Sequence, residues 1–230
     1  MPQQSQILTQ LLTCKDHKKA EPRPGCLKCD RLVAYRRANK KNYPDYFNGA
    51  TGSFGAPLAR IAIIGLAPGL HGANQTGRPF TGDQSGHMLF DCLIKEGFAT
   101  GPFENRPDDG LVLHNTLITN AVRCAPPENK PTRQEVINCR PFLKQRLKAM
   151  PNLKVIFALG KIAHDTILKT YDLALSKYPF AHNACYTLPE HGLILISSYH
   201  CSRYNVNTGR ITENMLRDAL KQAKTAAGLD

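Results

Sequence analysis

Polar and aromatic side chains gather in four segments that follow predicted strands. The segments are residues 65–83, 120–127, 159–160 and 200–210. An aromatic ring among glycines can stack on a flat ligand, and an amide can donate and accept along one edge of it. A histidine can donate to an oxygen that becomes negative, and a carboxylate can hold a water. These groups belong, in that order, to Phe80, Asn120, His200 and Asp83.

Each of these four side chains also has an ordinary structural interpretation. Phe80 could be a core residue, Asn120 a turn residue, Asp83 a helix cap and His200 a surface histidine. The interpretation as a site gains from their common location, because an open α/β sheet binds its ligand beyond the carboxyl ends of its strands. Residues 65–83 contain neither G-x-G-x-x-G nor G-x4-G-K-[ST], so the loop does not match the two common phosphate-binding motifs.

The chain has eight cysteines, and four of them form two spaced pairs. Cys26 and Cys29 make a C-x2-C pair, and Cys124 and Cys139 make a C-x14-C pair. Four thiolates could hold a zinc ion or an iron–sulfur cluster, and the spacing leaves both open. Cys139 falls within a predicted helix, where a buried free cysteine is common. The other four cysteines are expected to serve as small apolar residues: Cys14, Cys92, Cys185 and Cys201. Cys14 could also replace one of the paired cysteines as a metal or cluster ligand.

Short apolar runs alternate with segments of helical periodicity along most of the chain. Strands are predicted over residues 61–65, 111–122, 154–158 and 192–197. Helices are predicted over residues 5–12, 30–41, 84–96, 133–150, 161–170 and 213–226, the last three begun by Thr132, Gly160 and Thr212. This order predicts an α/β fold with three α/β/α layers and a central, mainly parallel four-stranded sheet. We expect one domain over residues 1–230, with residues 1–25 as an N-terminal extension.

Charge and hydropathy indicate the kind of partner. The 230 residues carry a formal net charge of +12, which favours a polyanion, most often nucleic acid, although it could serve solubility alone. The apolar runs are too short to span a bilayer, and the N-terminus has no secretory signal pattern. We therefore expect a cytoplasmic protein with no membrane partner. In that reducing compartment, the cysteines are not expected to form disulfides.

Three long motifs resemble those of a known family. They are GLAPGLHGANQTGRPFTGDQSG at residues 65–86, TNAVRCAPPENKPT at residues 119–132 and HCSRYNVNTGRIT at residues 200–212. Together with the two cysteine pairs, they make the chain similar to the uracil-DNA glycosylases of family five, the iron–sulfur "type B" enzymes of bacteria and archaea. The resemblance covers roughly residues 26–212.

The resemblance implies roles for individual residues. Phe80 would stack on the extruded base, Asn120 would bind its edge, His200 would stabilise it as it departs, and Asp83 would orient or activate the attacking water. Gly65 and Ala67 would also line the base pocket. A [4Fe–4S] cluster would be bound by Cys26, Cys29, Cys124 and Cys139. Contacts to DNA, with Tyr204 as a wedge, would come from Ser202, Arg203, Tyr204, Asn205 and Arg210.

The implied activity is DNA repair by base excision. A monomer would hydrolyse the N-glycosidic bond of uracil, and of other deaminated bases, in double-stranded DNA, leaving an abasic site, with single-stranded DNA as a further candidate substrate. The motif segments contain no lysine other than Lys130, at the edge of its loop, which favours a monofunctional enzyme over a lyase. A rival hypothesis is a non-catalytic iron–sulfur or zinc DNA-binding protein with a redox regulatory role.

Two positions in the motifs bear on how such a site would work. Ala67 stands where other uracil glycosylases carry a carboxylate, an absence that family five shares, and a less demanding pocket could accept more bases. Cys201 stands where proline usually follows the motif histidine, so we expect a less rigid loop.

Overall fold

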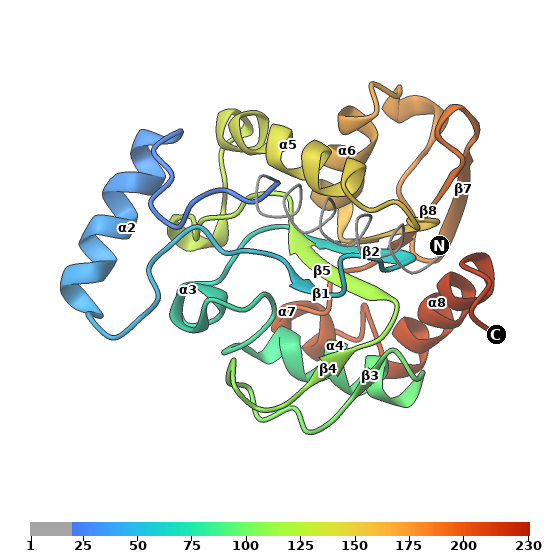
Figure 1. The fold of residues 1–230 in the computed structure, drawn as a ribbon, viewed down its shortest axis with the longest axis horizontal. Coiled ribbons are helices and arrows are strands. Elements are labelled where there is room, and N and C mark those ends of the chain that lie inside the picture. The colour runs from blue at the N-terminus through green and yellow to red at the C-terminus, as the bar shows by residue number, and fades with distance from the viewer. Residues whose placement is uncertain (1–19) are drawn as a thin grey trace, which may run out of the picture.

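The computed structural model describes residues 20–230, which are built around a mixed six-stranded sheet (Figure 1). Its strands, in spatial order, are β1 (Phe54–Gly55), β5 (Thr116–Asn120), β2 (Ile61–Gly65), β6 (Val155–Leu159), β8 (Leu193–Ser198) and β7 (Ala184–Leu188). The middle four are parallel, and both edge strands are antiparallel to their neighbours. The predicted α/β class and parallel core are confirmed. The predicted number of four strands is wrong, because it omitted both edges.

The parallel strands β5, β2 and β6 are buried throughout because helices cover both faces of the sheet (Figure 1). In β2, Ile61 and Ile63 face the core shared with α4 (Gln84–Lys95) and α8 (Glu213–Ala226). Ala62 and Ile64 face the opposite core, shared with α5 (Arg133–Lys148) and α6 (Lys161–Thr170). Because both faces are buried, β2 and β6 are continuous apolar runs in the sequence, whereas β5 and β8 carry buried Thr, Asn and Ser residues toward their carboxyl ends.

Polar caps begin the helices that carry the functional segments. Asp83 caps α4, Thr132 forms a capping box with Glu135 at the start of α5, and Thr212 caps α8. The remaining helices are α2 (Asp30–Asn42), α3 (Ala73–Thr76) and α7 (Arg203–Asn207). The predicted helices that fall within residues 20–230 are confirmed, and the one predicted over residues 5–12 lies outside the described residues.

Two segments differ from their predicted conformation. Residues 111–122 do not form one strand, because the chain turns at Asn115, whose φ of 50° is left-handed. The first part becomes β4 (Val112–Leu113), which pairs with β3 (Ala99–Thr100) in a separate two-stranded sheet. The segment after His200, expected to be a loop, contains α7. In residues 20–230, no helix combines the length and apolar character needed to cross a bilayer.

Candidate functional site

Three of the predicted site residues meet at the carboxyl ends of adjacent parallel strands. Gly65 ends β2 and is the register partner of Asn120, which ends β5 and is 3% exposed. A methyl group on Gly65 would lie 2.5 Å from Asn120 Oδ1 and 2.6 Å from the Cζ atom of Phe80. Only glycine permits this approach, so the amide and the ring converge on one point of backbone. We call Gly65, Phe80, Asp83, Asn120 and His200 the strand-end site.

Phe80 and His200 lie against each other across this site. Their ring centroids are 5.9 Å apart, with 26° between the planes. Phe80 has a left-handed φ of 55° and is only 7% exposed. It therefore does contact the core, as its structural interpretation supposed, and little of the ring is open. Burial lowers the pKa of His200 below its ordinary value, and the Asp83 carboxylate opposes that shift. His200 is therefore neutral at pH 7, with one ring N–H to donate.

Asp83 both caps a helix and faces the site. Its Oδ1 accepts a hydrogen bond from the Ser85 backbone N–H at 3.0 Å, which begins α4. Its Oδ2 points toward the glycine loop, where a methyl group on Gly72 or Gly69 would lie 2.4 or 3.1 Å away. One oxygen is thus committed to the helix, and the other faces backbone that carries no side chain. The carboxylate is held in place by the cap, with Oδ2 against the glycine loop.

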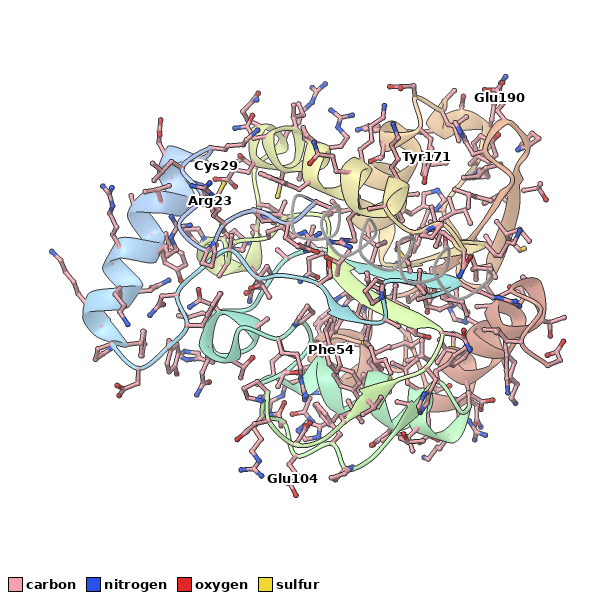
Figure 2. The ribbon with its side chains drawn as sticks, viewed as in Figure 1. Arg23, Cys29, Phe54, Glu104, Tyr171 and Glu190 are labelled. Atoms are coloured by element: carbon pink, nitrogen blue, oxygen red, sulfur yellow. The ribbon has the colours of Figure 1, made fainter. Side chains whose placement is uncertain are left out.

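A buried ion pair fixes the segment that carries Phe80 and Asp83. Arg78 donates to both carboxylate oxygens of Asp109 at 2.7 Å, and the two side chains are 6% and 0% exposed. The guanidinium also lies 4.9 Å from the ring centroid of Phe54 (Figure 2). It lowers the pKa of Asp109 to about 2. Nearby, the Gly82 N–H donates to Asn105 Oδ1 at 2.6 Å. We call the Arg78–Asp109 pair, together with the bond from Gly82 to Asn105, the clamp. The sequence did not predict it, because partners 23 to 31 residues apart leave no local pattern.

The segment after His200 holds the predicted DNA-contacting residues. Ser202 caps α7, and the Asn205 side chain donates to the His200 carbonyl at 2.8 Å. The fully buried Cys201 donates its thiol to the Ser85 carbonyl at 3.3 Å, which ties this segment to the start of α4. The three long side chains lie apart from these bonds. Arg203 is exposed, Tyr204 is 73% exposed, and the Arg210 guanidinium lies 4.8 Å from the ring centroid of Tyr199.

The four paired cysteines line one small cavity of about 20 Å³, which we call the cysteine cavity. It lies where the start of α2, next to Cys29, meets α5 and the segment after β5 (Figure 2). Ala67 packs against the small apolar cluster beside it, so this predicted base-binding residue lies toward the cysteine cavity. In the part of the chain that the structure describes, no group of three or more His, Cys, Asp or Glu side chains is arranged so that it could hold a metal ion.

Hydrogen-bond donors point at three of the four sulfurs. The Arg36 side chain donates to Cys124 Sγ at 3.5 Å, Asn138 to Cys29 Sγ at 3.7 Å, and the Arg123 backbone to Cys139 Sγ at 3.3 Å. Burial raises the pKa of Cys124 to about 12 and that of Cys139 to about 11. These groups are therefore neutral thiols in the structure. Donors aimed at sulfur are the contacts that tune sulfur-ligated centres, so the chemistry of these donors suits such a centre, whereas the described side chains are not arranged as its ligand set.

Comparison with known proteins places the chain in a class. A sequence profile described as the uracil DNA glycosylase superfamily matches residues 53–224, which include every residue of the strand-end site. A "Type-5 uracil-DNA glycosylase" of Thermus thermophilus is 44% identical over 210 residues, covering 89% of this chain and 95% of that protein. A protein of the same description from Pyrobaculum aerophilum is 39% identical over 208 residues, covering 89% and 90%.

The chain is also similar, at lower identity, to uracil-DNA glycosylases of another type. A "Type-4 uracil-DNA glycosylase" of Archaeoglobus fulgidus is 30% identical over 180 residues, covering 76% of each chain. The chain therefore belongs to the uracil-DNA glycosylase superfamily and, within it, to the type-5 uracil-DNA glycosylases. The family resemblance predicted from the three motifs is confirmed.

Proposed function

We propose that this protein hydrolyses the N-glycosidic bond of uracil in DNA, leaving an abasic site. The observation that carries the proposal is the convergence at Gly65, where an amide and an aromatic ring meet so closely that no side chain fits. His200 stacks on Phe80 from another segment, and the Asp83 carboxylate raises the pKa of His200 against the effect of burial. A stacking surface, a pairing edge, a hydrogen-bond donor and a carboxylate are the groups that excision of a base requires. The type-5 relatives carry the same activity in their names.

Binding begins with extrusion of the nucleotide. A base within the helix is out of reach of the site, so it must be flipped out at a cost of roughly a few kcal/mol. The extruded base would stack on Phe80 and pair with the Asn120 amide. Because only 7% of Phe80 is exposed, entry of the base requires the neighbouring His200 segment to move outward. The bonds of Asn205 and Cys201 would then hold that segment in its closed position.

The bond to be broken joins a base nitrogen to C1′ of the sugar. As it breaks, the base takes the electron pair and the sugar becomes cationic, as in other glycoside cleavages. The neutral His200 would donate its N–H to the oxygen of the departing base, where negative charge gathers. Asp83 Oδ2 would orient the water, whose oxygen bonds to C1′ and whose proton passes to the carboxylate. No covalent intermediate is needed, so the enzyme would be monofunctional.

The same geometry supports a wider range of bases. The Asn120 amide can donate to a carbonyl and accept from a ring N–H at once. That lactam edge is common to uracil, hypoxanthine and xanthine. We therefore include other deaminated bases among the substrates.

The segment after His200 would contact the DNA backbone. Tyr204 projects into solvent from α7 and would fill the space that the flipped base leaves. Arg203, Arg210 and the polar side chains of Ser202 and Asn205 lie within the same ten residues. Their chemistry suits phosphate and sugar contacts, which position a protein on DNA without reading its sequence.

The cysteine cavity would hold a [4Fe–4S] cluster through Cys26, Cys29, Cys124 and Cys139. Four sulfurs around one cavity, with donors aimed at three of them, support this proposal. When bound, the cluster would link α2 and α5 and supply no step of base release, because its ligands lie outside the strand-end site. Iron and acid-labile sulfide content of the purified protein tests this. Zinc without iron would contradict it.

The activity is tested with a uracil-containing duplex. After incubation, alkali breaks the strand at every abasic site, and the expected result is a break at the uracil position only. A panel with hypoxanthine and xanthine, in single- and double-stranded DNA, then defines the range of bases. A protein that binds the duplex and leaves no alkali-sensitive site would support the rival hypothesis, a non-catalytic DNA-binding protein.

A further inference from the structure

Beside the strand-end site, three aromatic rings form a partly exposed surface that catalysis does not use. The Tyr43 and Tyr46 rings are stacked with centroids 4.8 Å apart and 18° between their planes. The exposed His71 ring stands edge-on to both, and its Nδ1 lies 3.0 Å from the Tyr46 hydroxyl. We call Tyr43, Tyr46 and His71 the tyrosine platform. Residues far apart in the sequence thus present their rings together.

A hydrogen-bonded turn supports the tyrosine platform. The Asn48 side chain donates to the carbonyls of Tyr43 and Tyr46 at 2.8 and 3.0 Å, and Asn48 has a left-handed φ of 49°. Asn48 Oδ1 in turn accepts from the Asn74 side chain of α3 at 3.0 Å. The backbone N–H of Phe47 donates to the Gln75 carbonyl at 3.0 Å. The two tyrosines are therefore held in place before any ligand binds, which lowers the entropy that binding would cost.

The tyrosine platform adjoins the proposed catalytic carboxylate. His71 is followed by Gly72, whose added methyl group would lie 2.4 Å from Asp83 Oδ2. The His71 carbonyl would lie 2.8 Å from a methyl group on Gly82, the residue before Asp83. A ligand that reaches the free oxygen of Asp83 is therefore next to His71. The rings form a continuation of the strand-end site.

The charge beside the tyrosine platform suits a polyanion. The final turns of α2 carry the exposed side chains of Arg37, Lys40 and Lys41. The turn between the two tyrosines contributes one acidic residue, Asp45. Three cations against one anion, next to stacked rings, form the combination by which proteins hold single-stranded nucleic acid. The base stacks on the ring, and the phosphates meet the cations.

We propose that the tyrosine platform stacks an unpaired base next to the flipped nucleotide, while the basic end of α2 contacts phosphates of the same strand. This inference rests on the proposed function, since it takes the flipped nucleotide to lie at Asp83. It extends the DNA contacts beyond the segment after His200 to the opposite side of the site. It also gives the enzyme a preference for DNA in which one neighbour of the damaged base is already unpaired.

The test measures binding to DNA that holds a tetrahydrofuran abasic analogue, which the enzyme cannot cleave. One oligonucleotide leaves the bases unpaired on the 5′ side of the analogue, a second leaves them unpaired on the 3′ side, and a third is fully duplex. The variants are Tyr43→Ala with Tyr46→Ala, and Tyr43→Phe with Tyr46→Phe. The matched control is Tyr186→Ala, which removes a partly exposed tyrosine on the edge strand β7, outside the tyrosine platform. Fluorescence anisotropy reports each affinity.

The alanine pair should bind one of the two partly single-stranded oligonucleotides about tenfold more weakly, since one stacked base is lost. Its affinity for the other two should stay close to that of the wild type. The phenylalanine pair keeps both rings and should bind like the wild type, as should the control. An alanine pair that binds all three DNAs as tightly as the wild type does would overturn the inference. So would an equal loss on all three, or a loss in the phenylalanine pair as large as in the alanine pair.

Uracil release by the wild-type protein is measured in the same preparations. Absence of release, with the binding pattern intact, would reject the proposed function and leave the tyrosine platform as a nucleic-acid site. Normal release with no effect of the alanine pair would reject the platform alone.

Discussion

The strand-end site and the cysteine cavity both use residues at or after the end of β5, yet the first is closely packed and the second is arranged around a space. At the strand-end site, atoms of different segments touch, and an added methyl group at Gly65 would meet Asn120 and Phe80 at once. At the cysteine cavity, side chains from α2, α5 and the segment after β5 line a small space between the four sulfurs. The first region is complete from protein atoms alone. The second surrounds a space.

The two regions therefore differ in the interactions that stabilise them. The strand-end site is held by protein contacts, chiefly the Arg78–Asp109 pair and the bonds of the His200 segment. Three of the four sulfurs have a single donor each, at 3.3 to 3.7 Å, and sulfur is a weak acceptor. The comparison therefore predicts that the cysteine cavity needs its occupant for stability and that the strand-end site does not.

The largest effect should follow from removal of one cysteine ligand. Cys139→Ser should lose iron and reduce the free energy of unfolding by about 4 kcal/mol or more, because loss of a metal centre is among the largest single-residue effects. Urea unfolding and iron analysis measure both quantities. Cys185→Ser is the matched control, since Cys185 is exposed on β7. Full stability of Cys139→Ser would show that the cavity needs no occupant.

The clamp behind Phe80 should rank next. Arg78→Met leaves the Asp109 carboxylate buried without its cation and should cost about 3 kcal/mol of stability. Arg106→Met is the control, because its pair with Glu104 is more than half exposed and should contribute at most about 1 kcal/mol. Urea unfolding of the two variants at neutral pH compares them. Similar losses would contradict the assigned role of the clamp.

The Arg78–Asp109 pair should also make the free energy of unfolding depend on pH in the acid range. The pKa of Asp109 falls from an ordinary 3.8 to about 2 in the folded protein, so the unfolded chain binds the proton more readily. The stabilisation is present above the ordinary value and is lost as the pH falls toward about 2. Arg78→Met should remove this part of the acid dependence.

Close packing at the strand-end site should appear as a kinetic effect. In Gly65→Ala, the new methyl group must displace Asn120 or Phe80, and a displacement of this size costs roughly a hundredfold in rate. Single-turnover release of uracil measures it. Gly25→Ala should release uracil like the wild type, because its methyl group meets no atom. Comparable rates for the two variants would remove the contrast between the regions.

The smallest effect concerns the thiol that stands in a position usually occupied by proline. Cys201→Ala removes the bond to the Ser85 carbonyl and should cost about 1 kcal/mol of stability. Cys201→Ser retains a donor and should cost less. Urea unfolding orders the three proteins. A serine variant less stable than the alanine variant would show that the hydrogen bond contributes nothing.

The sequence predicts the centre of this fold better than its edges. The parallel strands β2 and β6 are continuous apolar runs because both faces are buried, and that pattern is visible without a structure. β7 alternates between partly buried and exposed residues, and β1 has two residues, so neither forms such a run. The turn at Asn115 was missed because the residues on both sides of it are apolar enough to continue a strand.

The strand-end site, too, was predictable from the sequence in part. Motif spacing predicted which side chains follow strands, and the structure brings Gly65, Phe80 and Asn120 together as expected. It does not indicate that Phe80 would be nearly covered, or that Asp109 would fix Arg78 from 31 residues away. Those facts depend on packing between distant segments. The functional roles of these residues stay predictions that the variants above test.

The central claim is that one carboxylate serves two purposes, with Oδ1 capping α4 and Oδ2 directing water. Single-turnover release of uracil by Asp83→Asn tests it, because asparagine caps a helix as well as aspartate does and leaves the fold intact. The amide cannot take a proton from water, so release should fall by about 10²- to 10⁴-fold while unfolding and DNA affinity stay unchanged. Release at a rate close to that of the wild type would contradict the account.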